Sequence, residues 1–302
     1  MRGRWFNAGH RRSEVSDKGG TRSGMWRAFP CRGSDEQLFA IGDVHGQSAA
    51  LAAVLQAISD CPRDGRPRHL IFLGDLIDRG PDSLGAVRLA MDARRLARVD
   101  QVTILPGNHE LMLLDGLLDP DTYMADWLDN GGDAVIKEAD PGCTARKLSD
   151  LADIVRSAFD PDFLRRMTEG PTWYQSGDLL FVHAGLQPGV DPVTFLTQPR
   201  FWAEGAHWAW IREPFLNWRG GWGPEGAWIV IHGHTPVLTK RAGLSQFETV
   251  ADLISSHRRL CLDAGPAYGV GQVSWAEFGS DRYRLSLTQA PEKPFSDLLG
   301  PL

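Results

Sequence analysis

Five short polar clusters in the sequence hold residue types that commonly bind divalent metal ions. Each cluster follows an apolar segment, and together they are Gly42–Gly46 (GDVHG), Gly74–Gly80 (GDLIDRG), Gly107–Glu110 (GNHE), His183–Gly185 (HAG) and His232–His234 (HGH). Asp, Asn and His offer oxygen and nitrogen donors that suit Mn, Fe, Zn or Mg. Because the clusters contain no cysteine, a structural zinc site built from thiolates is not expected.

With such ligands, a pair of metal ions roughly 3.5–4 Å apart could hydrolyse a phosphate ester. The pair would hold one hydroxide as the nucleophile and neutralise the phosphoryl group at the same time. Both ions need a shared carboxylate, and Asp75 is the best candidate. A single Asp or His at a strand end is more often a cap or a hydrogen-bonded core group. The ordered set of five favours a common site instead.

The motifs GDVHG, GDLIDRG, GNHE, HAG and GHT resemble, in this order, the signature set of the phosphoprotein-phosphatase branch of the metallophosphoesterases, which are calcineurin-like enzymes. The resemblance spans about Leu38 to Gly265. Within the family, the sequence is most similar to the bacterial Ser/Thr protein phosphatase type. It implies an α/β fold in which helices flank a two-sheet β-sandwich. It also implies two divalent metal ions, with Mn²⁺ favoured over Fe, Zn or Mg.

The resemblance also implies a role for each motif residue. It assigns Asp43, His45 and Asp75 to the first metal, and Asp75, Asn108, His183 and His234 to the second. His109 would be the general acid that protonates the leaving oxygen, and Asp78 would hold its imidazole in the useful tautomer. Arg79 would bind phosphate oxygens through its guanidinium, and Asn108 would also contact the substrate.

A second phosphate-binding arginine is expected between the HAG and GHT motifs, and two positions fit. Arg212 fits bacterial and phage-like members best, whereas Arg219 resembles the eukaryotic pattern; we favour Arg212. Glu110 could act in catalysis, or its charge could simply favour the start of the following helix. His232 could support the site from behind or be a core histidine.

Apolar strands alternating with helices must position these clusters. The expected strands are 38–41, 69–73, 101–105, 178–182 and 227–231, with helices at 48–59 and 83–99. This βα pattern predicts a parallel sheet covered by helices. A mainly helical insert, interrupted at Asn130-Gly131-Gly132, is expected over residues 123–173 and would overhang the site. Short strands are expected at 261–265, 272–278 and 281–289, the last two as a hairpin.

The charge distribution divides the chain of 302 residues, which has a net charge of −6. Residues 1–33 carry eight Arg or Lys against Glu14 and Asp17 and lack apolar periodicity, so we expect a disordered basic tail over residues 1–34. A basic arm for nucleic acid or anionic lipid, or an over-extended start codon, is the alternative. The catalytic domain is expected over residues 35–290 and a C-terminal tail over 291–302.

The acidic balance argues against nucleic acid as a general partner. No signal peptide or membrane span is expected from the apolar runs, and four scattered cysteines favour reduced thiols in the cytoplasm. The favoured function is a dinuclear-metal phosphomonoesterase acting on phosphoprotein Ser or Thr. The alternative substrate class is diadenosine tetraphosphate or another small phosphate ester, and a phospho-binding pseudoenzyme is the rival from outside enzymes. In dinucleoside tetraphosphatases the position of Asp78 typically holds Ala, so the Asp favours phosphomonoesters.

Overall fold

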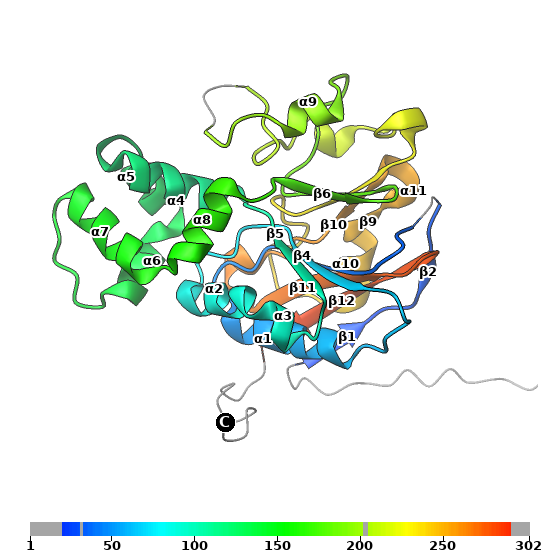
Figure 1. Ribbon diagram of the computed structural model, residues 1–302, viewed down its shortest axis with the longest axis horizontal. Helices are drawn as coiled ribbons and strands as arrows, with labels where there is room; N and C mark the ends of the chain where they lie inside the picture. The colour runs from blue at the N-terminus through cyan, green and yellow to red at the C-terminus, as the bar shows by residue number, and fades with distance from the viewer. Residues whose placement is uncertain (1–19, 31–32, 202–204, 291–302) are drawn as a thin grey trace, which may run out of the picture.

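Two mixed β-sheets pack face to face at the centre of the molecule, and helices cover the outside (Figure 1). The computed structural model describes residues 20–30, 33–201 and 205–290. The strands are β1 (Gly20–Ser23), β2 (Arg27–Ala28), β3 (Gln37–Ile41), β4 (Arg68–Phe72), β5 (Gln101–Ile104), β6 (Trp173–Ser176), β7 (Leu179–Val182), β8 (Ile229–His232), β9 (Asp252–Leu253), β10 (Arg259–Cys261), β11 (Gln272–Phe278) and β12 (Arg282–Gln289). The larger sheet has the order β1-β12-β11-β3-β4-β5, with β2 beside β12, and the smaller sheet has the order β6-β7-β8-β10-β9. The predicted two-sheet sandwich flanked by helices is confirmed.

Along the chain, most of the helices either connect two strands or belong to the insert. The α-helices are α1 (Ser48–Asp60), α2 (Ser83–Met91), α3 (Ala93–Leu96), α4 (Asn108–Leu118), α5 (Pro120–Trp127), α6 (Asp133–Ala139), α7 (Leu148–Ala158), α8 (Pro161–Glu169), α9 (Pro192–Leu196), α10 (Leu244–Ala251) and α11 (Ile254–His257). Short turns of other helix types are η1 (Leu128–Gly132), η2 (Phe215–Asn217), η3 (Pro224–Gly226) and η4 (Pro266–Tyr268). Among the described residues, no helix is both long and apolar enough to cross a membrane.

The apolar strands alternate between two cores. In β3, Leu38 and Ala40 pack between the sheets, while Phe39 and Ile41 pack against the helices outside the larger sheet. In β7, likewise, Phe181 faces the other sheet and its neighbours face outward. Because both faces of these strands are covered, a continuous apolar sequence is expected in each. This burial explains why the strands were recognisable from the sequence.

Strand direction brings the polar clusters to one edge of the sandwich. Strands β3, β4 and β5 are mutually parallel in the larger sheet, as are β7, β8 and β10 in the smaller one. Parallel strands end at the same edge, so the residues that follow them gather there. The helix predicted at 48–59 is confirmed by α1. The helix predicted at 83–99 is divided at Asp92, whose carboxylate accepts a hydrogen bond from Arg95 Nε (3.1 Å).

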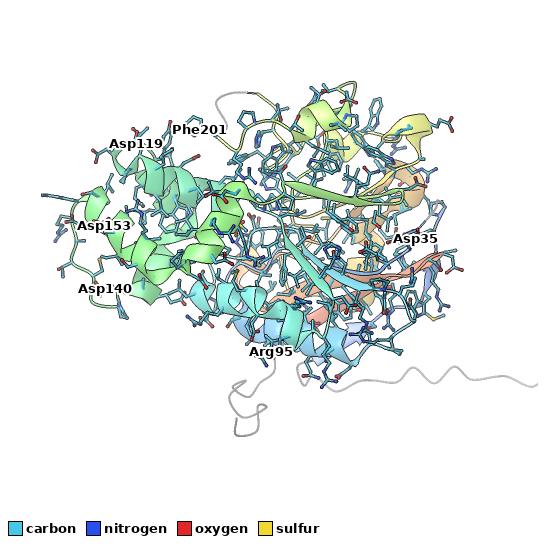
Figure 2. All side chains as sticks on the ribbon, viewed as in Figure 1. Asp35, Arg95, Asp119, Asp140, Asp153 and Phe201 are labelled. Atoms are coloured by element: carbon cyan, nitrogen blue, oxygen red, sulfur yellow. The ribbon has the colours of Figure 1, made fainter. Side chains whose placement is uncertain are left out.

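The helical insert forms a lobe beside the sandwich (Figure 1). Helices α5 to α8 confirm the mainly helical prediction for residues 123–173, and Gly131 breaks the helical conformation with φ of 111°. Trp127 and Phe163 are buried in the core that the lobe shares with the larger sheet. Figure 2 shows Asp119 and Asp153 on the outer surface of the lobe.

Part of the predicted disordered tail is instead folded. Strand β1 pairs with β12, and Thr21 Oγ1 hydrogen-bonds Thr288 Oγ1 (2.8 Å). Strand β2 places Arg27 in ion pairs with Glu248 and Asp252. The prediction of disorder is wrong for residues 20–30, because polar side chains can form an edge strand when a partner strand supplies the hydrogen bonds. Residues 1–19, and the predicted C-terminal tail at 291–302, lie outside the described residues.

We expect that deleting residues 1–28 lowers the Tm relative to deleting residues 1–19. The longer deletion removes β1, β2 and the stacking of Trp26 on Arg282 (4.7 Å) and Arg284 (5.0 Å). A loss of about 2 kcal/mol lowers the Tm of a domain this size by roughly 4–8 °C. Differential scanning calorimetry measures the difference, and equal Tm values for both truncations would contradict a stabilising role for these strands.

Candidate metal centre

A polar cavity of about 330 Å³ opens where the parallel strands of both sheets end. Its wall combines residues from the polar clusters with others from the insert and the C-terminal third. The lining residues are His45, Asp75, Arg79, Asn108, His109, Met112, Asn130, Trp210, Arg212, His234, Pro236, Asp263, Ala267 and Tyr268. The structure therefore brings most of the residues singled out from the sequence to one place.

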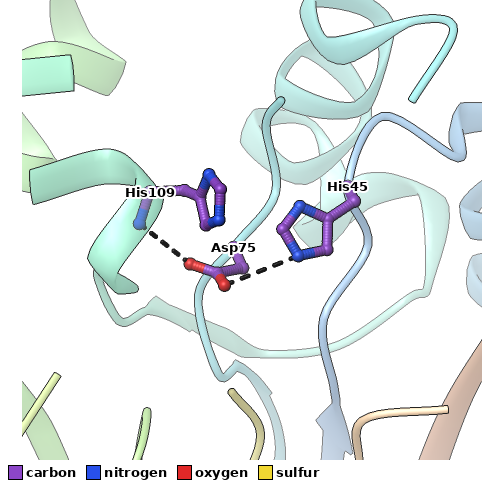
Figure 3. A group of neighbouring side chains, drawn as sticks. All are labelled: His45, Asp75 and His109. Atoms are coloured by element: carbon purple, nitrogen blue, oxygen red, sulfur yellow. Dashed lines mark hydrogen bonds and ion pairs between the residues drawn. The ribbon is translucent and has the colours of Figure 1, made fainter. Parts of the chain in front are cut away.

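Two groups of potential metal ligands share Asp75. One group is His45, Asp75 and His109, and the other is Asp75, His183 and His234; within each group the donor atoms lie within 4.8 Å of one another. Figure 3 shows Asp75 between His45 and His109, with Oδ2 at 3.5 Å from His45 Nε2. The shared position of Asp75 is what a bridging carboxylate requires.

Backbone carbonyls fix the tautomers of three of the histidines. His45 Nδ1 lies 3.0 Å from Ile77 O, and His183 Nδ1 lies 2.8 Å from Leu73 O. His234 Nε2 lies 3.1 Å from Trp210 O. If each of these nitrogens donates to its carbonyl, the other ring nitrogen carries a lone pair toward the cluster. Metal-binding histidines are oriented in this way in proteins.

Asn108 joins the second group through its amide oxygen. Asn108 Oδ1 lies 2.8 Å from His234 Nδ1 and 3.0 Å from His183 Nε2. In the tautomers described above, three electron-pair donors face one another at these contacts. A cation between them would turn mutual repulsion into ligation. The buried donor set therefore fits divalent metal ions.

Asp43 lies next to these groups but belongs to neither of them. Its two carboxylate oxygens accept hydrogen bonds from the backbone N–H of His234 (3.1 Å each). Burial, with the negative charges of Asp263 and Asp75 nearby, raises the pKa of Asp43 well above its usual range. A nearby cation would relieve the repulsion among these three carboxylates.

His109 and Asp78 form a buried pair at the start of α4. His109 Nδ1 lies 2.7 Å from Asp78 Oδ2, and the backbone N–H of His109 donates to Asp75 Oδ1 (3.1 Å; Figure 3). Burial opposes the charged imidazole, but Asp75 and the hydrogen bond with Asp78 raise the pKa of His109 above its usual value. The pair therefore has the geometry predicted for an acid and the carboxylate that orients it.

The arginines differ in where they lie. Arg79 lines the cavity, and its Nε donates to Asn130 O (3.0 Å). Arg212 also lines the cavity and acts electrostatically on His234. Arg219 is not among the residues that line it, and it lies near His257 instead. This placement supports the preference for Arg212.

Glu110 supports the loop that carries Asp75. Its fully buried carboxylate accepts hydrogen bonds from the backbone N–H groups of Asp75, Leu76 and Gly107, each at 2.8 Å. Burial and the charge of Asp75 raise the pKa of Glu110 to about 7. The hydrogen bond from Gly107 N–H agrees with the interpretation of Glu110 as a residue that favours the start of α4. The same carboxylate also ties the loop of Asp75 to this helix.

Asp263 is a site residue that the sequence analysis missed. The prediction of a strand at 261–265 is wrong beyond its first residue, because β10 covers Arg259–Cys261; Asp263 therefore lies outside the sheet and lines the cavity. Burial raises its pKa to about 6. A carboxylate directly after a parallel strand was the available signal. His232, by contrast, packs edge-on against Phe215 (5.0 Å between ring centroids) and does not line the cavity, as expected of a core histidine.

The backbone around the site adopts unusual conformations. The non-glycine residues His45, Asp75, Asp78, Arg79 and His234 have φ between 44° and 73°. Such conformations are costly and concentrate at functional sites. The motif glycines allow close approach: a Cβ at position 107 would lie 2.1 Å from Asp75 Oδ1, and one at position 233 would lie 2.0 Å from Asp43 Oδ1.

The fold and this donor arrangement together define the metallophosphoesterase class. Two facing sheets place His, Asp and Asn donors around one shared carboxylate at the ends of parallel strands. The profile described as calcineurin-like phosphoesterase matches residues 37–264. The chain belongs to this family.

The chain is similar in sequence to two kinds of enzyme, serine/threonine-protein phosphatases and bis(5'-nucleosyl)-tetraphosphatases. Serine/threonine-protein phosphatase 1 of Salmonella typhimurium is 36% identical over 96 residues, which are 32% of this chain and 39% of that protein. Serine/threonine-protein phosphatase 2 of Escherichia coli is 38% identical over 96 residues, which are 32% of this chain and 38% of that protein. An asymmetrical bis(5'-nucleosyl)-tetraphosphatase, PrpE of Bacillus velezensis, is 29% identical over 223 residues, which are 67% of this chain and 78% of that protein. The matches to the two protein phosphatases thus span about two fifths of those proteins.

Proposed function

We propose that the protein is a metal-dependent phosphomonoesterase that acts on phosphorylated Ser or Thr side chains of proteins. The observation that carries this proposal is the sharing of Asp75 by two groups of buried potential metal ligands, one of which contains His109 in its pair with Asp78. Family membership supports the phosphoesterase chemistry. The oxygen and nitrogen donors suit two divalent ions, and we propose Mn²⁺.

We propose a role for each group of residues. Asp43, His45 and Asp75 would hold one ion, and Asp75, Asn108, His183 and His234 would hold the other. Bound ions of this kind activate water and stabilise charge on a phosphoryl group. Arg79 and Arg212 would bind phosphate oxygens from the cavity wall, with Asn108 close to the same oxygens.

The protonation of the leaving oxygen falls to His109 in this proposal. His109 Nδ1 is occupied by Asp78, so Nε2 is the ring nitrogen available to give a proton to the leaving alcohol. A Ser or Thr alkoxide is a poor leaving group and gains most from such an acid. The presence of Asp78, buried and bound to His109, therefore supports a phosphomonoester of a protein side chain as substrate.

Dinucleoside tetraphosphates are the second candidate substrate class. This alternative is favoured by PrpE of Bacillus velezensis, to which the similarity extends over two thirds of the chain. Loss of a nucleotide phosphate needs little protonation, so such a substrate would depend less on His109.

For the location we propose the cytoplasm, since the described cysteines Cys61, Cys143 and Cys261 are free thiols.

A direct comparison of substrates tests the assignment. With Mn²⁺ supplied, we expect kcat/KM for the best phosphoserine or phosphothreonine peptide to exceed that for diadenosine tetraphosphate. The phosphopeptide panel should include phosphotyrosine, so that selectivity among side chains is measured in the same assay. A kcat/KM for diadenosine tetraphosphate about tenfold above every peptide, or about 1.4 kcal/mol, would reject the protein-phosphatase assignment.

A further inference from the structure

The helical insert contacts the loop that carries Asp78 and Arg79 through one short turn. This turn comprises residues 127–132. Arg79 N donates to Gly131 O (3.0 Å), and Arg79 Nε donates to Asn130 O (3.0 Å). Trp127 Nε1 donates to Asp78 Oδ2 (2.9 Å). The lobe thus reaches two residues of the proposed active site.

The contact with Asp78 is unusual because so few groups hold this carboxylate. Asp78 is fully buried, and its Oδ2 contacts both His109 Nδ1 and Trp127 Nε1. Its Oδ1 is buried and has no hydrogen-bond partner among the described residues. Within the described part of the chain, the indole N–H is therefore the one donor besides His109 that fixes the rotation of the carboxyl group. Hydrogen bonds to a charged acceptor of this kind are among the stronger ones.

The local packing fixes the indole in this position. Trp127 is fully buried, and a Cβ on Gly132 would lie 2.4 Å from its ring atoms. A Cβ on Gly131, which has φ of 111°, would lie 2.5 Å from Arg79 Cγ. The two glycines thus allow Arg79 and the indole ring to approach this turn closely. The spacing W-x-x-N-G-G is thus explained by contact with the site rather than by helix termination alone.

A second contact joins the lobe to the start of α2, the helix that follows this loop. Glu138, on helix α6 of the lobe, accepts hydrogen bonds from the backbone N–H of Ser83 (2.8 Å) and Leu84 (3.0 Å). Ser83 Oγ in turn accepts a hydrogen bond from Asp78 N (3.0 Å). The lobe therefore contacts the side chain of Asp78 directly and its backbone N–H only through Ser83.

We infer that Trp127 is a positioning residue for the acid step, acting through Asp78 on His109. The inference rests on the proposed function, in which His109 protonates the leaving oxygen. The indole N–H selects Oδ2 as the oxygen that faces His109, so the imidazole stays aligned with the leaving group. The helical lobe is then a part of the catalytic apparatus and not only a wall of the cavity.

The substitution Trp127→Phe tests this inference, because it removes the N–H and keeps an aromatic ring. We expect kcat for phosphoserine to fall about tenfold, a part of the 10²–10⁴ that a general acid contributes, and kcat for p-nitrophenyl phosphate to fall less than about twofold. KM and metal content should stay unchanged. Trp275→Phe is the matched control, since it removes a buried indole N–H that donates to Thr288 Oγ1 (3.1 Å) away from the cavity. It should leave the ratio of the two kcat values unchanged.

A double-mutant cycle tests whether the effect passes through Asp78. If it does, Trp127→Phe added to Asp78→Asn should change the substrate ratio little beyond Asp78→Asn alone. Full additivity, or a wild-type ratio in folded Trp127→Phe, would overturn the inference. Should Trp127→Phe not fold, proton NMR decides: the Trp127 indole N–H resonance is expected downfield in the wild type and should move upfield in Asp78→Asn. No such movement would also overturn it.

Failure of this inference is distinguishable from failure of the proposed function. If His109→Asn discriminates between the two substrates while Trp127→Phe does not, only the role of Trp127 is wrong. If His109→Asn also fails to discriminate, the acid assignment itself is wrong.

Discussion

Asp75→Asn is expected to abolish hydrolysis of an aryl phosphate, with kcat falling on the order of 10³-fold or more. Asp75 belongs to both ligand groups, so an amide in its place weakens both at once. Its carboxylate also accepts the backbone N–H of His109 (3.1 Å), a hydrogen bond that the amide oxygen of Asn can still accept. Metal analysis of the purified variant should find fewer than two ions per chain.

The control for this variant is the same substitution at a remote site. Asp119→Asn changes an exposed residue on the outer surface of the lobe (Figure 2) and should leave activity and metal content unchanged. Near-normal activity of Asp75→Asn, or of wild-type protein after treatment with a chelator, would be incompatible with a dinuclear mechanism.

His109→Asn is expected to lower kcat by on the order of 10²–10⁴ for phosphoserine and much less for p-nitrophenyl phosphate. An activated aryl oxide is a good leaving group and departs without being protonated. The alkoxide of Ser is a poor leaving group and needs a proton from the acid as it departs. Asp78→Asn should show a milder version of the same selectivity, because the imidazole stays present but loses its carboxylate partner at 2.7 Å. Steady-state kinetics on both substrates measure the effect.

The same experiment separates an acid from a metal ligand. A ring nitrogen of His109 lies within 4.8 Å of the potential ligand atoms of His45 and Asp75, so a ligand role is the competing interpretation. A ligand role predicts equal losses on both substrates and a lower metal content. His257→Asn, at a partly exposed position away from the cavity, is the control and should leave both activities unchanged.

The apolar strands and the polar clusters that follow them could be predicted because two simple patterns coincide. Strands such as β3 and β7 are covered on both faces, so their sequences are continuously apolar. The parallel direction of the strands then places Asp43, Asp75 and His183 at one edge without further information. For this part, local sequence was sufficient.

The features that were missed depend on partners far along the chain. Strand β1 is polar and becomes a strand only because β12 supplies hydrogen bonds. Asp263 resembled part of a strand, since the sequence does not show where β10 ends. The hydrogen bond from Trp127 to Asp78, 49 residues away, forms only when the lobe packs against the site loop. Local pattern cannot encode such contacts, because they depend on tertiary packing.

The two halves of the ligand set come from different sheets. His45 and Asp75 follow strands of the larger sheet, whereas His183 and His234 follow strands of the smaller one. A cation held between them would link the two sheets non-covalently. It would bind the native state and not the unfolded chain, because only the folded protein brings the two pairs of residues together. By thermodynamic linkage, ions at 100 times their Kd would then add about 2.7 kcal/mol to the free energy of unfolding. The catalytic cation would thus also serve as a structural one.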